Sequence, residues 1–282
     1  MSAGLTILTV AILTAISCSI LGVFLVLKNM SMLTDTISHT ILLGIVISFF
    51  IVKKLDSPML LVGATIVGLV TVYLVELITS SKLVKEDAAI GVVLSFLFSV
   101  AVILISKYTA NIHLDIDAVL LGEIAFAPFY TMNIFGFTIS KGIIYGLINI
   151  LVNISFIYIF FKELKISIFD KNLAFALGLF PNLIHYMFMS LVSITSVVAF
   201  ESVGAMLLIS FMIGPPVSAY LLSKSISGMM IISIIIDVLA SIIGYTVAIK
   251  LDVSISGMIA IVIGIIFLIV FILKKIFNKY ML

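Results

Sequence analysis

The sequence predicts an all-α membrane protein, a polytopic bundle of eight or nine transmembrane helices that forms a single transmembrane domain over residues 1–282. Two observations lead to this prediction. The first is composition: 63% of the residues are hydrophobic and 10% are charged, whereas a soluble domain has roughly 45–50% apolar and about 25% charged residues. The second is that the apolar residues gather in runs of about 20, the length that crosses a bilayer. We therefore expect lipid to surround the chain.

Nine apolar runs approach or exceed this length, at residues 4–27, 30–52, 58–79, 88–106, 143–161, 183–203, 205–222, 229–249 and 256–273. The sixth and seventh runs meet at Gly204, so one broken helix and a total of eight spans is the alternative. The N-terminal residues MSAG lack the basic region of a cleavable signal peptide, so we expect the first run to be retained as a helix.

Lysine placement predicts the orientation. All 15 basic residues are lysines, and the formal net charge of +2 is too small to indicate a nucleic-acid partner. With the N-terminus outside and the C-terminus in the cytoplasm, ten lysines fall on the inner side and five on the outer side. Cytoplasmic loops carry the excess of positive charge, which favours this orientation. A single cysteine, Cys18, excludes an intrachain disulfide and a cysteine metal cluster.

Two connections are too long to be simple turns. The outer segment, residues 107–141, contains "NIHLDIDAVLLGEIAFAPFY". The inner segment, residues 162–182, reads "KELKISIFDKNLAFALGLFPN" and has an amphipathic, helix-like pattern that we expect Pro181 to stop. A short cytoplasmic helix can contact a soluble protein or lie on lipid headgroups, and periodicity alone does not choose between these roles. The pentapeptide "SISGM" occurs at 225–229 and 254–258, and we expect both copies to be helix N-caps.

Asp35 and His39 are the strongest candidates for a functional site. In a helix that begins near Asn29, Asp35 lies about 9 Å and His39 about 15 Å from the inner end. The i, i+4 spacing places both side chains on one face. An ionisable group at this depth costs at least ~2.5–3.5 kcal/mol, so it normally faces a bundle interior or a watery path. Carboxylate oxygen with imidazole nitrogen suits Mn²⁺, Zn²⁺ or Fe²⁺; a structural hydrogen-bonded pair and a proton relay are the alternatives.

Two ligands from one chain are too few for a tight metal site. A symmetric dimer would bring two aspartates and two histidines around its axis, so that the copies of Asp35 and His39 form a set of two nitrogens and two oxygens. The sequence alone leaves open whether such a dimer forms.

Three residues within the later apolar runs are weaker candidates. Glu201 lies near the outer end of the sixth run, where it could line an entry path or reach the interface. His185 begins the same run and is expected to be interfacial. Asp237 falls in the middle of the eighth run, so its depth makes it a functional candidate, although a lone protonated, structural carboxyl is the alternative.

The sequence "HLDID" in the outer segment offers a further polar group. Its members could form a weak metal antechamber or a docking surface, but solvated loop charges are the simpler expectation; they are His113, Asp115 and Asp117.

Three motifs are absent from the sequence. It contains no G-x-x-x-x-G-K-[ST] run for nucleotide phosphates and no H-E-x-x-H of a zinc protease. It also contains no G-x-S-x-G elbow of a serine hydrolase. An enzyme acting alone is therefore poorly supported, and a transporter whose energy comes from another chain fits better.

Several stretches share their pattern with one known family. The family pattern L-x-x-M-S-x-x-x-D-x-x-S-H-x-x-x-x-G appears here as "LKNMSMLTDTISHTILLG". That stretch covers residues 27–44. Further matching stretches are "KEDAAIGVVLSFLFSVAVILIS" (85–106), "HLDIDAVLLGEIAFAPF" (113–129), "KELKISIFDKNLAFALG" (162–178) and "AFESVGAMLLISFMIGPPVSAYLL" (199–222). Together they resemble the permease subunits of bacterial zinc, manganese and iron importers of the ABC class, over nearly the whole chain. The third stretch is similar to the branch associated mainly with manganese and iron.

The resemblance implies the fold of a type II ABC importer permease, in the bacterial cytoplasmic membrane. It implies a homodimer, or a heterodimer with a second permease, above cytoplasmic ATP-binding subunits, with a metal-binding receptor docked outside. Residues 1–282 would be a single permease domain with no permanently bound cofactor. The transported ion would be manganese, zinc or iron.

By matching position, Asp35 and His39 are the family's D-x-x-S-H pair, and the resemblance implies a role for them in metal translocation. The coupling segment, residues 162–182, would seat in the ATPase through Asp170, Ala174 and Gly178.

Departures from the family pattern concern the metal pair. The family usually has glycine where this chain has Thr34, and often alanine where it has Thr40. Asp237 matches no family position. The alternatives are a proton-coupled secondary transporter that uses Asp35, His39 and Asp237, and an intramembrane metal-dependent enzyme.

Overall fold

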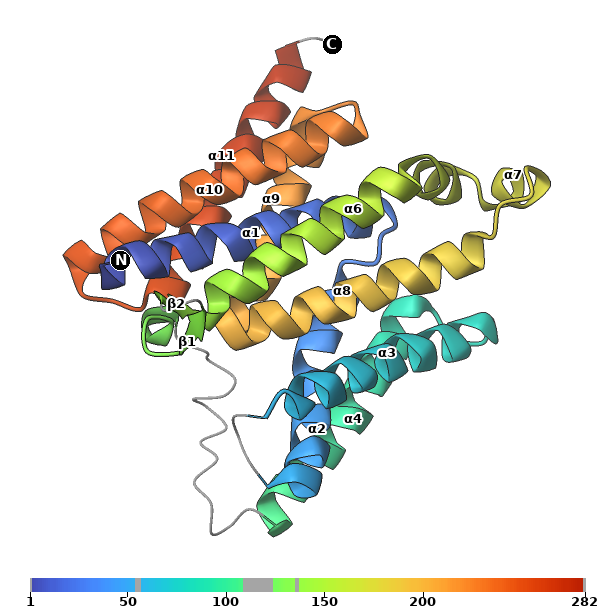
Figure 1. Ribbon diagram of the computed structural model, residues 1–282. Coiled ribbons are helices and arrows are strands. Elements are labelled where there is room, and N and C mark those ends of the chain that lie inside the picture. Colours follow the sequence, from blue (N-terminus) through green and yellow to red (C-terminus); the bar gives the residue numbers. More distant parts are fainter. Residues whose placement is uncertain (1, 54–56, 109–123, 135–136, 281–282) are drawn as a thin grey trace. The chain divides into compact units, whose positions relative to one another are not determined.

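The computed structural model describes residues 2–53, 57–108, 124–134 and 137–280 (Figure 1). In this part of the chain nine α-helices are long and apolar enough to cross a membrane. They are α1 Ala3–Leu27, α2 Met32–Val52, α3 Met59–Ser80, α4 Glu86–Tyr108, α6 Lys141–Phe169, α8 Pro181–Val203, α9 Ala205–Leu222, α10 Ile226–Leu251 and α11 Ile255–Tyr280. The all-α prediction is confirmed, and α8 and α9 are separate helices joined at Gly204, whose φ of +83° breaks the helical path.

The chain divides into two compact units. Unit 1 comprises Met1–Ser31, Leu121–Phe161 and Val198–Leu282. Within it α1 packs on α9 and α10, and α11 packs on the same two helices. The backbone of α1 lies so near α9 that a Cβ on Gly22 would clash with the Met212 carbonyl oxygen, the close approach that small residues allow in membranes.

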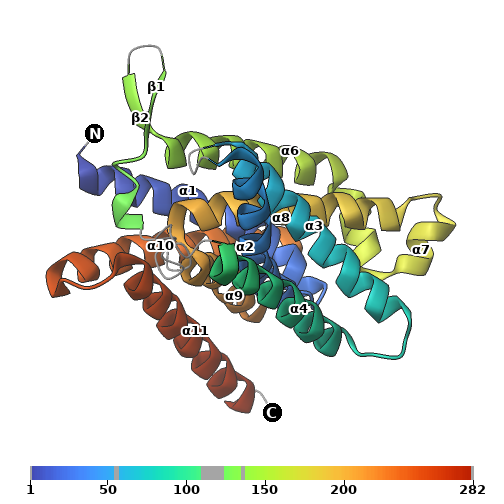
Figure 2. The same ribbon diagram turned by 90° about the horizontal axis from the view of Figure 1, so that it is seen from below.

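Unit 1 also holds the described part of the outer segment. The 3₁₀ turn η1, Ile124–Phe126, precedes a hairpin of β1, Thr131–Ile134, and β2, Phe137–Ser140. The strands pair antiparallel, with Thr131 opposite Ser140, and the hairpin leads directly into α6 (Figure 2).

Unit 2 comprises Met32–Leu120 and Lys162–Val197. Within it α2 packs on α3 and α4. A Cβ on Gly44 of α2 would clash with the Gly63 carbonyl of α3, so the two backbones touch. The Thr71 hydroxyl of α3 donates to the Thr40 hydroxyl oxygen of α2 over 2.8 Å. These contacts hold the helix of the candidate pair against its neighbour.

The inner segment differs in detail from the prediction. Helix α6 continues to Phe169 across a kink at Phe160, where φ is −103° and ψ is 17°. The short helix α7, Lys171–Ala176, follows. We had expected Pro181 to stop this segment, and this expectation is wrong. Pro181 is instead the first residue of α8, the position where a missing N–H costs no helical hydrogen bond.

The two "SISGM" copies are N-caps, as predicted. The Ser225 hydroxyl accepts from the Gly228 N–H over 3.2 Å before α10. The Ser254 hydroxyl accepts from the Gly257 N–H over 3.4 Å before α11. Each serine therefore satisfies one of the free N–H groups at a helix start.

Candidate functional site

Helix α2, which carries Asp35 and His39, begins later than its sequence suggests. Asn29 has a φ of +59°, and the helix begins at Met32, so the predicted start near Asn29 is wrong. At 1.5 Å per residue, Asp35 then lies about 4.5 Å and His39 about 10.5 Å from the start of the helix. The carboxylate belongs to the first turn, where the helix dipole stabilises negative charge.

The two candidate side chains lie next to each other, as their spacing predicts. His39 Nε2 is 3.4 Å from Asp35 Oδ1, and the side chains are 35% and 40% exposed respectively. The His39 ring meets Phe98 of α4 edge to face, with centroids 5.9 Å apart and planes at 78°. This contact limits rotation of the imidazole, and both side chains of the pair remain partly exposed.

The hydroxyl residues around the pair are enclosed within the protein. All are fully buried, namely Thr34, Thr36, Ser38 and Thr40. The Ser38 hydroxyl donates to the Thr34 carbonyl over 2.8 Å. Thr40, which stands where the family often has alanine, is the acceptor of the Thr71 hydroxyl. Among the described residues, Asp35 and His39 have no hydrogen bond or ion pair to a second helix. The hydrogen bond between α2 and α3 is instead made by Thr40 and Thr71.

The geometry of the pair suits a shared metal ion. Two ligand atoms about 2.1 Å from one ion at octahedral or tetrahedral angles are roughly 3.0–3.4 Å apart, and the observed separation is 3.4 Å. No group of three potential His, Cys, Asp or Glu ligands occurs within the described residues. The described residues therefore offer two potential ligands here, and an ion bound by them would need water or a second subunit to complete its coordination.

Asp237 has a partner that the sequence could not show. It is fully buried in α10 and accepts a hydrogen bond from the Ser19 hydroxyl of α1. The Ser233 hydroxyl donates in turn to Ser19 over 3.3 Å. Two buried oxygens of this group, Asp237 Oδ1 and Ser241 Oγ, have no partner in the described part of the chain. Asp237 thus belongs to a buried polar contact of unit 1, whereas Asp35 and His39 belong to unit 2.

The other predicted residues differ in what the structure shows. Glu201 lies near the end of α8 and is exposed, and its carboxyl interacts electrostatically with Lys141 at the start of α6. His185 Nε2 lies 3.8 Å from Glu76 Oε2 of α3, a partner that the sequence analysis missed. Glu76 is the one acid in α3, which was the available signal. The "HLDID" residues, His113, Asp115 and Asp117, lie outside the described residues.

The inner segment has defined ends around α7. The Asp170 carboxylate accepts from the Leu173 N–H over 2.9 Å and caps the helix start. At the other end Gly178 has a φ of +74°, and the Leu179 N–H bonds to the Ala174 carbonyl over 3.0 Å, which is the Schellman arrangement. The Ala174 side chain is buried.

Comparison with known proteins identifies the class of protein. Residues 5–274 match the family described as the ABC 3 transport family. The chain belongs to the ABC 3 transport family. It is 45% identical over 240 residues to the manganese transport system membrane protein MntD of Bacillus subtilis, covering 85% of this chain and 81% of that one. It is 44% identical to the zinc transport system membrane protein TroD of Treponema pallidum, over 73% of this chain and 56% of that protein.

A solved structure is also similar to this ABC 3 family chain. PsaBC from Streptococcus pneumoniae, in complex with Fab, matches with a TM-score of 0.79 and 29% identity, over 96% of this chain and 91% of that one. The chain is therefore a multi-pass membrane permease of an ATP-driven importer, and it is not itself an enzyme. Family membership favours this role over the secondary transporter and the intramembrane enzyme.

Proposed function

We propose that this permease imports a divalent metal ion, with manganese as the first candidate and zinc and iron as alternatives, through a site at Asp35 and His39. The observation that carries the proposal is the 3.4 Å approach of His39 Nε2 and Asp35 Oδ1 on a face open to solvent or a partner. The names of MntD and TroD support manganese and zinc. Iron is supported by ligand chemistry alone, since carboxylate and imidazole also suit Fe²⁺.

The open pair favours transient binding. An ion that enters exchanges part of its water for one carboxylate oxygen and one imidazole nitrogen, and it must leave again on the other side. Conduction requires binding that is favourable enough for entry and weak enough for release. A second permease, either a copy of this chain or a related one, would add its own pair across a shared axis. Glu201 and the "HLDID" residues remain candidates for the rest of the pathway, whereas the burial of Asp237 against Ser19 favours the structural alternative for that residue.

The partners follow from the ABC class. A cytoplasmic ATP-binding subunit would contact α7 and its flanks, where large apolar side chains are exposed, namely Phe169, Leu173, Phe175, Leu177 and Phe180. A metal-binding receptor would dock on the outer segment, residues 107–141. This arrangement requires the N-terminus outside and the C-terminus in the cytoplasm, as the lysines predict.

One compact unit holds both the metal pair and the coupling residues. Asp170, Ala174 and Gly178 belong to unit 2, as do Asp35 and His39. Helix α7 leads into α8, whose Ser193 hydroxyl donates to the Thr65 carbonyl of α3 over 3.3 Å. Helix α3 in turn holds α2 through Thr71 and Thr40. These hydrogen bonds support a rigid connection between α7 and α2. The movement that accompanies ATPase closure would be transmitted through this connection to His39.

Uptake by shape-conserving variants tests the metal site. Uptake of radioactive manganese is measured in vesicles that contain the permease, its ATPase and its metal-binding receptor. We expect Asp35→Asn and His39→Gln to lower this uptake at least about tenfold, because loss of even an outer partner of a metal site costs roughly 10- to 100-fold. Asp252→Asn, which removes the same charge from an exposed turn, is the control and should transport normally. Co-purification with the ATPase should be unchanged in all three variants. Uptake near the wild-type rate by either site variant would defeat the assignment.

A further inference from the structure

Helix α11 carries two lysines at the depth of the lipid headgroups. The helix has 26 residues, Ile255–Tyr280, and is about 39 Å long at 1.5 Å per residue. A bilayer core is about 30 Å thick. Lys274 and Lys275 lie about 29 and 30 Å from the start of the helix by the same rise. Their ammonium groups therefore belong at the boundary where hydrocarbon meets headgroups.

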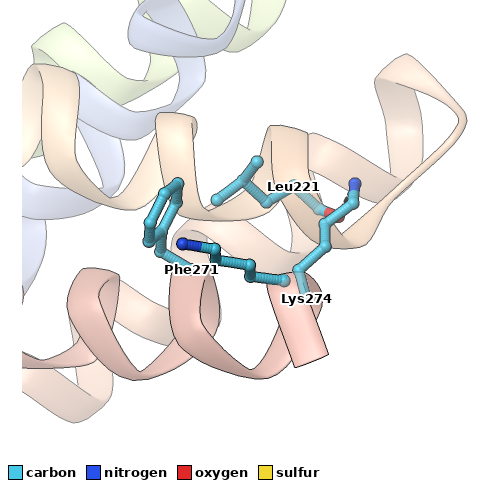
Figure 3. Close-up of a pocket in the computed structure, with 4 residues that line it drawn as sticks. Leu221, Phe271 and Lys274 are labelled. Carbon is cyan, nitrogen blue, oxygen red and sulfur yellow. Dashed lines mark hydrogen bonds between the residues drawn. The ribbon is translucent and has the colours of Figure 1, made fainter. Parts of the chain in front are cut away.

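These lysines line a pocket between α9 and α11. The pocket has a volume of about 280 Å³ and is lined by Leu221, Phe271, Lys274 and Lys275. Figure 3 shows Phe271 and Lys274 on α11 facing Leu221 near the end of α9. All four residues belong to unit 1. The volume exceeds that of several water molecules, so a phosphate group fits within it.

The two lysines have different partners. The Lys274 ammonium donates to the Leu221 carbonyl oxygen, one of the last carbonyls of α9, where a cation complements the helix dipole. Lys275 is exposed, and among the described residues no carboxylate pairs with it. The pocket therefore presents one positive charge that the described part of the chain leaves uncompensated, beside the apolar ring of Phe271.

We propose that this pocket binds the phosphate of an anionic phospholipid. Lys275 would contact the phosphate oxygens, Lys274 would add charge from the rim, and Phe271 would cover the first carbons below the headgroup. The α11 residues that precede Lys274, toward the middle of the bilayer, include exposed apolar side chains such as Leu268 and Ile272. These side chains offer a surface for an acyl chain. Basic pockets between transmembrane helices bind acidic lipid headgroups in this way.

Position favours a lipid over a soluble anion or an acidic protein segment. Of the candidate spans, α11 has the smallest buried share, 22% of its most apolar window. Its exposed residues on both sides of the pocket are large and apolar, Leu273 and Ile276 included. A free phosphate would make no favourable contact with the apolar side chains. An acidic protein segment would have to reach these side chains at the depth of the lipid headgroups.

Lipid binding to the purified permease–ATPase complex tests the proposal. Native mass spectrometry would count retained lipids while phosphatidylglycerol is titrated into the detergent solution. We expect Lys275→Gln to weaken phosphatidylglycerol binding about fivefold, the factor for about 1 kcal/mol per basic residue near an anionic surface. Lys250→Gln, an exposed lysine in the last turn of α10, is the matched control and should bind as the wild type does.

Two further arms identify the source of the phosphate. Phosphatidylcholine, whose headgroup has no net charge, should bind weakly and equally to wild type and Lys275→Gln. Inorganic phosphate should not compete at millimolar concentration; full competition would replace the lipid with a soluble anion and overturn the proposal. Equal phosphatidylglycerol affinity for wild type and Lys275→Gln would also overturn it. So would loss of the ATPase from Lys275→Gln with lipid binding unchanged, because the pocket would then belong to a protein partner.

Discussion

Asp35 and Asp237 are both aspartates in transmembrane helices, yet their surroundings differ. The Asp35 side chain is 40% exposed and touches His39. Asp237 is fully buried and is held by the Ser19 hydroxyl. A passing ion needs ligands that it can reach and leave, and the exposure of Asp35 would meet this need at the proposed site. A carboxyl enclosed by hydroxyls from two helices provides helix–helix attachment, as polar residues often do in membranes.

This difference leads to a prediction for Asp237. Asp237→Asn keeps an acceptor for the Ser19 hydroxyl and nearly the same volume, so we expect wild-type metal uptake and thermal stability. Asp237→Ala leaves the buried Ser19 hydroxyl without its acceptor, and we expect it to lower stability by about 1–2 kcal/mol. The midpoint of thermal unfolding in detergent measures this loss.

The opposite pattern would assign Asp237 to the ion path. In that case Asp237→Asn would abolish uptake in vesicles while its unfolding midpoint stayed at the wild-type value. Ser19→Ala serves as the control, because it removes the same hydrogen bond from the α1 side and leaves the carboxylate in place.

Local spacing predicted the contact of Asp35 with His39, because residues four apart on a helix are neighbours whatever surrounds them. The partner of Asp237 was not predictable in this way. Ser19 and Asp237 are 218 positions apart, and only the packing of α1 on α10 brings them together. Glu76 and His185 illustrate the same limit within unit 2.

At the scale of elements, α7 depends on its two ends. It has six residues, too few to be stable alone, since isolated helices shorter than about 12 residues are marginal in water. The Asp170 cap and the turn at Gly178 therefore determine its shape. A Cβ on Gly178 would meet no atom within 4 Å, so any effect of a substitution there arises from the backbone.

Substitution of Gly178 tests whether this shape matters for coupling. At a φ of +74°, an ordinary L-residue costs about 1–2 kcal/mol, whereas asparagine is tolerated at this helix position. We expect Gly178→Val to lower metal uptake per ATP hydrolysed and Gly178→Asn to preserve it. Both quantities can be measured in the same vesicles. Normal coupling in Gly178→Val would remove Gly178 from the coupling role.

Helix number was predictable from the sequence, but several helix ends were not. Apolar runs located all nine candidate spans, because lipid demands about 20 apolar residues in each. The start of α2 was placed three residues early, since apolarity does not reveal that Asn29 adopts a positive φ. The role of Pro181 was also missed, because proline both ends one helix and begins another.

At the scale of the whole molecule, the predicted orientation depends on the lysines. Ten of the fifteen fall on one side of the membrane when the nine spans alternate. If α7 contacts the ATPase as proposed, Lys171 lies on the same side as Lys224, and Lys53 and Lys250 lie on the outer side. The proposed partner and the charge distribution therefore favour the same topology.

Cysteine labelling can test this topology cleanly because the chain has one cysteine, Cys18, which is buried. In a Cys18→Ala background, Lys53→Cys and Lys250→Cys should react with a membrane-impermeant maleimide in intact cells. Lys171→Cys and Lys224→Cys should react only after the membrane is permeabilised, and the background without a new cysteine should not react at all. Labelling in the reverse pattern would place α7 outside, beyond reach of any cytoplasmic ATPase, and the coupling role of Asp170, Ala174 and Gly178 would fall with the orientation.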